Sequence, residues 1–132
     1  MENQQKQLVT EFLTAVKLLD LEKIGSLLDP EVKWSQPGNN DVSGLKNSQQ
    51  EVFEMVGKMF AITGNTLKLN AFNSISINDN RVACQLHWTA EKVSGEKLDV
   101  YNTDIYTVEH DKISRVDIFS ADMTQEDNFW KS

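Results

Sequence analysis

The residues best suited to chemistry are an imidazole and a carboxyl group, His87 and Asp104, on either side of a turn at Gly95-Glu96. If that dipeptide forms the tip of a hairpin, His87 lies opposite Asp104 and Gln85 lies opposite Tyr106. The period of two then puts these side chains on one face of the sheet. A one-residue bulge would reverse which face they occupy.

Two kinds of role fit the pair of His87 and Asp104. Burial raises the pKa of a carboxyl group, whereas a neighbouring imidazolium lowers it, so the two together would make an acid–base couple. Alternatively, they form a cross-strand pair in which each polar group only satisfies the other, worth roughly 0.2–1 kcal/mol. The pattern alone leaves both roles open.

Patterns for metal and cofactor binding are missing from the sequence. The chain has two histidines and one cysteine, Cys84, without the spacing of a metal site. It also has no Gly-x-Gly-x-x-Gly segment of the kind that cradles phosphates. We therefore expect neither a metal nor a cofactor, and we expect Cys84 to behave as a small apolar residue.

The elements that must position these groups run from helices to strands. Leu8, Phe12 and Ala15 recur at helical spacing, and after Gly64 the apolar period changes from that of a helix to that of a strand. We expect helices over 3–19, 21–28 and 48–64, a short strand over 31–36, and long strands over 66–77, 81–93, 98–109 and 112–121. This order predicts an α+β fold with helices on one face of an antiparallel sheet. The tail residues Phe129 and Trp130 are expected to fold back onto the body or onto a partner.

The composition limits the possible partners. The 132 residues suit one domain, 1–132. Because 20 Asp and Glu outnumber 13 Lys and Arg, for a net charge of −7, we expect no binding to nucleic acid or to an anionic membrane surface. The sequence offers neither a signal peptide nor an apolar run long enough to span a membrane. With a single cysteine, a cytoplasmic location is the simplest expectation.

A family resemblance rests on Leu21-Glu22-Lys23-Ile24, Leu27 to Val32, Ser43-Gly44, Ser94 to Val100 and Asp104 to Val108. In the order and spacing of these segments, over roughly residues 5–122, the chain resembles the nuclear transport factor 2-like superfamily and, within it, the SnoaL-like branch. The resemblance implies a cystatin-like cone, in which a strongly curved sheet wraps the first helix and the open end forms a pocket. It also implies a homodimer through the outer sheet face.

The resemblance further implies roles for particular residues. Asp104 corresponds to the aspartic acid that ketosteroid isomerases of this superfamily use in their oxyanion hole. Their catalytic base falls on Gln36 and their tyrosine donor on Phe12, neither of which can do that chemistry. The Arg and Asp that epoxide hydrolases carry on one central strand are absent too. Both mechanisms are therefore unexpected, and an isomerase- or cyclase-like reaction that uses Asp104 with His87 is the remaining enzymatic option.

The same resemblance implies which side chains line the pocket, and it turns Asp104 and His87 toward its interior. Trp34 would either wall the pocket or belong to the core, and Gln36 would either orient a ligand carbonyl or cap the following loop. The expected lining residues are Phe12, Trp34, Gln36, Phe53, Val56, Gln85, Tyr106, Val116 and Ile118.

Three functions fit these expectations. The first is binding, without chemistry, of a small apolar molecule that bears a carbonyl group. The second is a cofactor-independent acid/base enzyme in which Asp104 and His87 act on an enolisable carbonyl compound. The third is a dimeric interaction module that uses the face of Trp88 and the tail at Phe129 and Trp130. Replacement of Asp104 and His87 would abolish only the second function.

Overall fold

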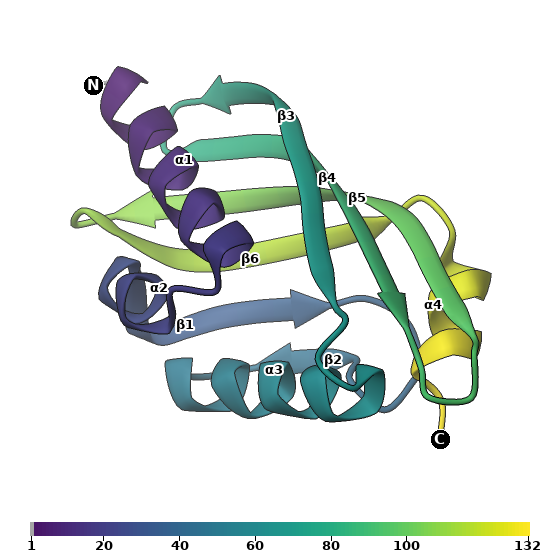
Figure 1. The fold of residues 1–132 in the computed structure, drawn as a ribbon. Coiled ribbons are helices and arrows are strands. Elements are labelled where there is room, and N and C mark those ends of the chain that lie inside the picture. The colour runs from purple at the N-terminus through teal and green to yellow at the C-terminus, as the bar shows by residue number, and fades with distance from the viewer. Residues whose placement is uncertain (1) are drawn as a thin grey trace.

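The fold is a curved six-stranded sheet with α1 lying across one face and α3 running beside β1 and β2 (Figure 1). The computed structural model describes residues 2–132. The helices are α1 (Glu2–Leu18), α2 (Leu21–Leu27), α3 (Gln49–Thr63) and α4 (Met123–Trp130). The strands are β1 (Leu28–Gln36), β2 (Gly44–Lys46), β3 (Lys68–Asn78), β4 (Arg81–Glu91), β5 (Lys97–Glu109) and β6 (Lys112–Ser120).

The strands lie in the order β2-β1-β6-β5-β4-β3. All neighbouring strands are antiparallel except β1 and β6, which are parallel because the chain returns to β1 only after α3 and the β3–β6 meander. The predicted α+β class, with three N-terminal helices on a curved sheet, is confirmed. Among residues 2–132, none of the helices combines the length and the apolar composition of a membrane-spanning helix.

The starts of two helices follow from capping side chains that the sequence already indicates. Asp20 accepts a hydrogen bond from the backbone N–H of Lys23 at 3.1 Å and so begins α2. Ser48 accepts one from the N–H of Glu51 at 3.1 Å and so begins α3. Gly64 then ends α3 with a φ of 58°, in the left-handed region that glycine adopts without strain.

The C-terminal tail forms a helix, α4, which the sequence pattern did not predict. Asp122 caps it by accepting from the N–H of Gln125 at 3.1 Å. Phe129 and Trp130 are 4% and 3% exposed, so the expectation that the tail folds back onto the body is correct. The Asp127 carboxylate accepts from the Asn39 N–H at 2.8 Å, which ties α4 to the loop between β1 and β2.

The register of the β4–β5 hairpin differs from the prediction. Residues 92–96 form the loop, rather than Gly95-Glu96 alone, so Cys84 pairs with Asp104 and His87 pairs with Tyr101. A two-residue tip would pair odd-numbered residues of one strand with even-numbered residues of the other. The longer loop instead pairs odd with odd and even with even. One strand is therefore turned over relative to the prediction, and the expected pairing of His87 with Asp104 is wrong.

Candidate functional site

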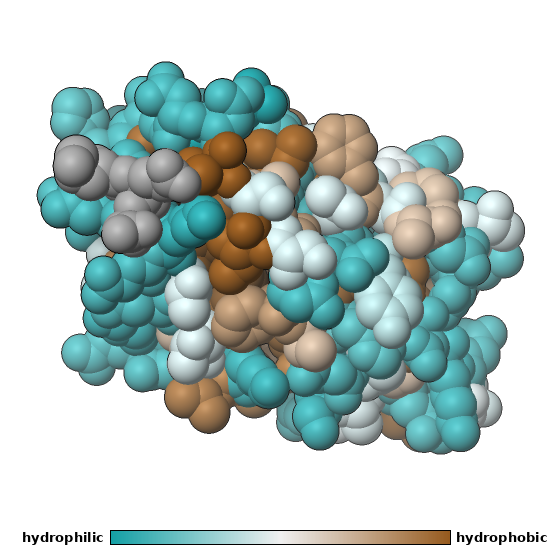
Figure 2. Space-filling view, turned by 90° about the horizontal axis from the view of Figure 1, so that it is seen from above, coloured by the Kyte–Doolittle hydropathy of each residue, from teal (hydrophilic) through white to brown (hydrophobic). Residues whose placement is uncertain are grey.

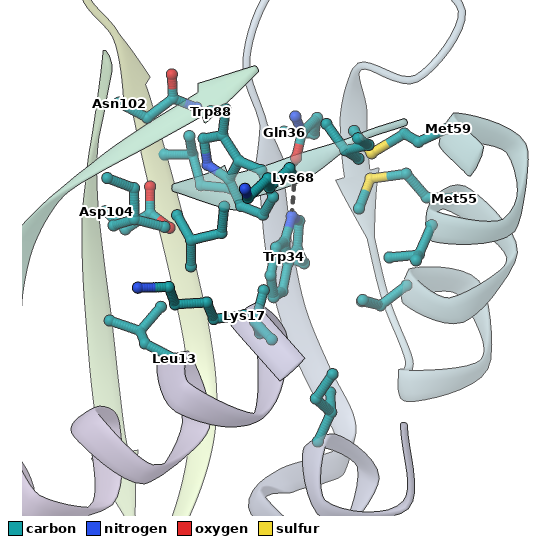
Figure 3. Close-up of a pocket in the computed structure, with 18 of the residues that line it drawn as sticks. Leu13, Lys17, Trp34, Gln36, Met55, Met59, Lys68, Trp88, Asn102 and Asp104 are labelled. Carbon is teal, nitrogen blue, oxygen red and sulfur yellow. Dashed lines mark hydrogen bonds between the residues drawn. The ribbon is translucent and has the colours of Figure 1, made fainter. Parts of the chain in front are cut away.

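A cavity of about 160 Å³ lies between α1, α3 and the inner face of the sheet (Figure 3). An engineered apolar cavity of about 150 Å³ holds a benzene ring, so this one has room for a body of about that size. Its wall is mostly apolar and includes Leu13, Val16, Ile24, Leu28, Val52, Met55, Met59, Leu69, Leu86, Trp88, Leu98 and Val100. All three tryptophans of the chain, Trp34, Trp88 and Trp130, contribute to it.

The cavity opens to solvent beside the junction of α1 and α2. Leu19 and Leu21 line the cavity and are each 54% exposed, and Lys17 and Lys68 are exposed lining residues as well. Buried side chains supply the deeper wall, so a ligand would enter past these four residues.

Asp104, on β5, is one of two acids that line this wall, and it is only 3% exposed. Its Oδ2 accepts a hydrogen bond from the Tyr106 hydroxyl at 2.6 Å, whereas its Oδ1 is buried and has no partner among the described residues. Burial raises the pKa of Asp104 to about 7, the Tyr106 hydrogen bond lowers it in part, and the nearby Glu126 charge raises it further. Both protonation states of Asp104 are therefore accessible near neutral pH.

Tyr106 and Cys84 lie beside Asp104, and both stay protonated when Asp104 titrates. Tyr106 is fully buried and packs edge-on against the Phe12 ring, with 5.7 Å between ring centroids. Burial, and then the Asp104 charge, raise the pKa of Tyr106 well above its usual value, so it stays a neutral donor. The same two causes raise the pKa of Cys84 to about 12, which keeps its thiol unreactive, as expected from the sequence.

Gln36 supplies a second polar group, and Trp34 fixes its orientation. The Trp34 indole, which can only donate, donates through Nε1 to Gln36 Oε1 at 2.9 Å (Figure 3). Gln36 is 8% exposed and lines the cavity, so its Nε2 group is a donor that a ligand could use.

Glu126, from α4, lines the cavity together with Asn102 and Trp130. It is 4% exposed. Asn102, with its amide turned so that both polar atoms are satisfied, donates to Glu126 Oε2 at 3.2 Å. Burial raises the pKa of Glu126, and the neighbouring Ser120 and Trp130 side chains oppose that rise. This part of the wall is therefore acidic, with Glu126 already hydrogen-bonded to Asn102, whereas the buried Trp130 Nε1 has no partner among the described residues.

The cavity wall includes most of the side chains that the sequence suggested for it. These are Phe12, Trp34, Gln36, Phe53, Val56, Asp104, Tyr106 and Ile118. Val116 is fully buried in the core but does not reach the cavity, so its expected position is wrong.

His87 and Gln85 are also misplaced by the sequence interpretation, because the hairpin register turns them to the outer face. The His87 Nε2 atom lies 2.6 Å from Asp99 Oδ1, and the His87 ring stacks on Tyr101 with 4.6 Å between centroids. Gln85 is exposed. Trp88, assigned to the outer face by the same register, lines the cavity instead. The proposed acid–base couple of Asp104 and His87 therefore does not form.

Glu126, Asn102 and Trp130 were missed as site residues. The sequence contains part of the pattern that would have predicted them, because Glu126, Phe129 and Trp130 have helical spacing after Asp122, a residue type that caps helices. Within the described residues, no group of three or more His, Cys, Asp or Glu side chains is arranged to hold a metal ion.

Comparisons with known proteins agree with this fold. A crystal structure from Xanthomonas campestris, of a protein of unknown function with a cystatin-like fold, is 31% identical, covers 97% of this chain and 98% of that one, and has a TM-score of 0.91. TerC, co-crystallised with polyporic acid, is 16% identical over 96% of this chain and 98% of its own, with a TM-score of 0.83. The uncharacterised protein Rv0034 of Mycobacterium tuberculosis is 24% identical over 84% of each chain. Residues 9–116 match the SnoaL-like domain family. The chain therefore belongs to the SnoaL-like domain family.

Proposed function

We propose that the chain binds a small, largely apolar molecule in the cavity and that Asp104 donates a hydrogen bond to a carbonyl oxygen of that molecule. The observation that carries the proposal is the buried, unpartnered Oδ1 of Asp104 in a mostly apolar wall, a statement that concerns the described residues only. A buried polar atom without a partner costs about 1–3 kcal/mol, and a ligand oxygen would recover part of that cost.

The donor role follows from the hydrogen bond that Asp104 already accepts. Because the Tyr106 hydroxyl donates to Oδ2, the proton of the neutral acid belongs on Oδ1. With a pKa of about 7, a large share of Asp104 is neutral at physiological pH. Oδ1–H is then a donor that needs an acceptor, and a carbonyl oxygen is one.

The rest of the wall supports a ligand of this class. Apolar side chains would surround its body, and the Gln36 amide is a further donor for a carbonyl oxygen. TerC, a protein with a similar fold, has been co-crystallised with polyporic acid. The chemistry once expected of Asp104 with His87 needs both groups in one site, and they occupy opposite faces of the sheet. Binding is therefore the function that the geometry supports best.

The proposal extends to the state and location of the protein. Tyr101 and Phe119 are 46% and 58% exposed on the outer face of neighbouring strands, and a homodimer through this face would cover them. Cys84 is the only cysteine of the chain and its thiol is unpaired, which suits a reducing compartment such as the cytoplasm.

A ketone and its matched alcohol test the donor role. 4-Phenylbutan-2-one can only accept a hydrogen bond, whereas 4-phenylbutan-2-ol can also donate one. We expect ketone affinity to fall roughly tenfold as the pH rises through the pKa of Asp104, because the ionised group has no proton to donate. Alcohol affinity should change much less. The fluorescence of Trp34, Trp88 and Trp130 in the wall reports both titrations.

Two variants separate the hydrogen bond from mere occupancy of the cavity. Asp104→Asn keeps a donor at every pH, so its ketone affinity should no longer depend on pH. Asp104→Leu offers no polar atom, so it should bind the ketone weakly at every pH. If wild-type ketone affinity is independent of pH and equals that of Asp104→Leu, the proposed contact does not exist.

A further inference from the structure

The opening of the cavity carries charges that the proposed function does not use. Lys17, in the last turn of α1, and Lys68, the first residue of β3, are both exposed and both line the cavity (Figure 3). The other charged lining residues, Asp104 and Glu126, are buried. Each exposed charge of the lining is thus positive, in a chain whose 20 acidic residues outnumber its 13 basic ones.

Among the described residues, neither ammonium group has a hydrogen-bond or ion-pair partner. Lys92 pairs with Glu96 at 3.0 Å, and Lys112 donates to the Ser26 carbonyl at 2.7 Å. Lys17 and Lys68 make no such contact with any described residue. A cation at the C-terminal end of a helix is favourable in itself, which accounts for Lys17 in part. Lys68 lies at the start of β3, an edge strand of the sheet, where an exposed lysine is also common.

We propose that the ligand is an amphipathic anion, with its apolar body in the cavity and a carboxylate or similar group at Lys17 and Lys68. The inference rests on the proposed function, because it requires a ligand in the cavity. The deeper wall is buried and mostly apolar, and a charged group there would lose its hydration without a cation to pair with, so the charged end stays at the opening.

The surroundings of the lysines fit such a molecule. Leu19 and Leu21, each 54% exposed, line the same opening and would contact the part of the apolar body that extends beyond the cavity. Seen from above, the surface of the molecule is mostly hydrophilic, and hydrophobic side chains show through it in several places (Figure 2). Exposed apolar side chains at an opening are explained when a ligand covers them.

4-Phenylbutanoate and 4-phenylbutanamide test the inference, because they share a shape and differ in charge. Calorimetric titration at about pH 6 and low salt should give the carboxylate the higher affinity, by about two- to fivefold for each lysine. Since the contact is exposed, this preference should shrink at about 0.5 M salt, whereas amide affinity should stay constant.

Glutamine variants assign the preference to the opening. In Lys17→Gln/Lys68→Gln, carboxylate affinity should drop to that of the amide, with amide affinity unchanged. Lys58→Gln is the matched control, because Lys58 is exposed on α3 and does not line the cavity. If the wild type binds both molecules equally, or if the double variant keeps the preference, the inference is wrong and the proposed function stands. If neither molecule binds, both the inference and the proposed function are wrong.

Discussion

Asp104 titrates while buried, so the free energy of unfolding depends on pH. Its folded pKa of about 7 lies above the ordinary value of 3.8, so the folded state holds the proton more tightly than the unfolded chain. The free energy of unfolding should therefore decrease as the pH rises from about 4 to about 7, by roughly 4 kcal/mol in all. The sign is opposite to that of a carboxylate stabilised by a cation.

Asp104→Asn isolates this effect, since the amide cannot ionise. We expect the variant to become more stable relative to the wild type as the pH rises, with the difference complete above the pKa of Asp104. Urea unfolding at several pH values measures it, and Asp111→Asn, in an exposed turn, controls for the loss of a surface charge. Parallel stability curves for the wild type and Asp104→Asn would show that Asp104 is ionised throughout.

Among the elements, α4 and the loop before β2 depend on one another. Asp127 of α4 accepts from the Asn39 N–H at 2.8 Å and from Asn40 Nδ2 at 2.9 Å. These hydrogen bonds lower the pKa of Asp127. Gly38 comes just before, with a φ of 96°, and a Cβ atom there would collide with Met123 and Asp127. A side chain at position 38 would therefore be strained at this φ, and the ends of the Met123 and Asp127 side chains would have to move to make room for it.

Two glycines with opposite surroundings test this dependence. Gly38→Ala should destabilise the protein by at least about 1 kcal/mol and loosen α4. Gly57→Ala, inside α3 with no atom within 4 Å of the new Cβ, should instead stabilise it by up to about 1 kcal/mol. Thermal unfolding gives both values, and the fluorescence of Trp130 reports α4. Equal effects of the two substitutions would contradict the role of Gly38.

The elements also show where sequence reasoning succeeded and failed. Helix starts at Asp20 and Ser48 were predictable, because each cap is a local contact between neighbours in the chain. The position of Asp104 in the wall followed from a resemblance that covers most of the chain. The face of the sheet that His87 occupies was predicted wrongly, because it depends on the length of a single loop. That loop is closed by a hydrogen bond from Lys92 N to Glu96 O at 2.8 Å. A change of one residue in that loop turns every side chain of β4 over.

At the scale of the whole molecule, the outer face of the sheet is the surface proposed to join two copies. Phe119→Ser should weaken that association at least tenfold, because it removes a ring that is 58% exposed in the single chain. Val93→Ser is the control, since Val93 is 94% exposed in the loop at 92–96 and does not lie on the outer face of the sheet. Sedimentation equilibrium over micromolar concentrations measures the dimer constant. A wild type that stays monomeric throughout would refute the dimer.

Part of the cavity is built by a helix that follows the segment matched to the family. The family match ends at residue 116, whereas Glu126 and Trp130 reach the wall from α4, at 123–130. Substitutions confined to this short terminal segment would therefore alter the chemistry of the cavity while leaving the matched segment, with Asp104, unchanged.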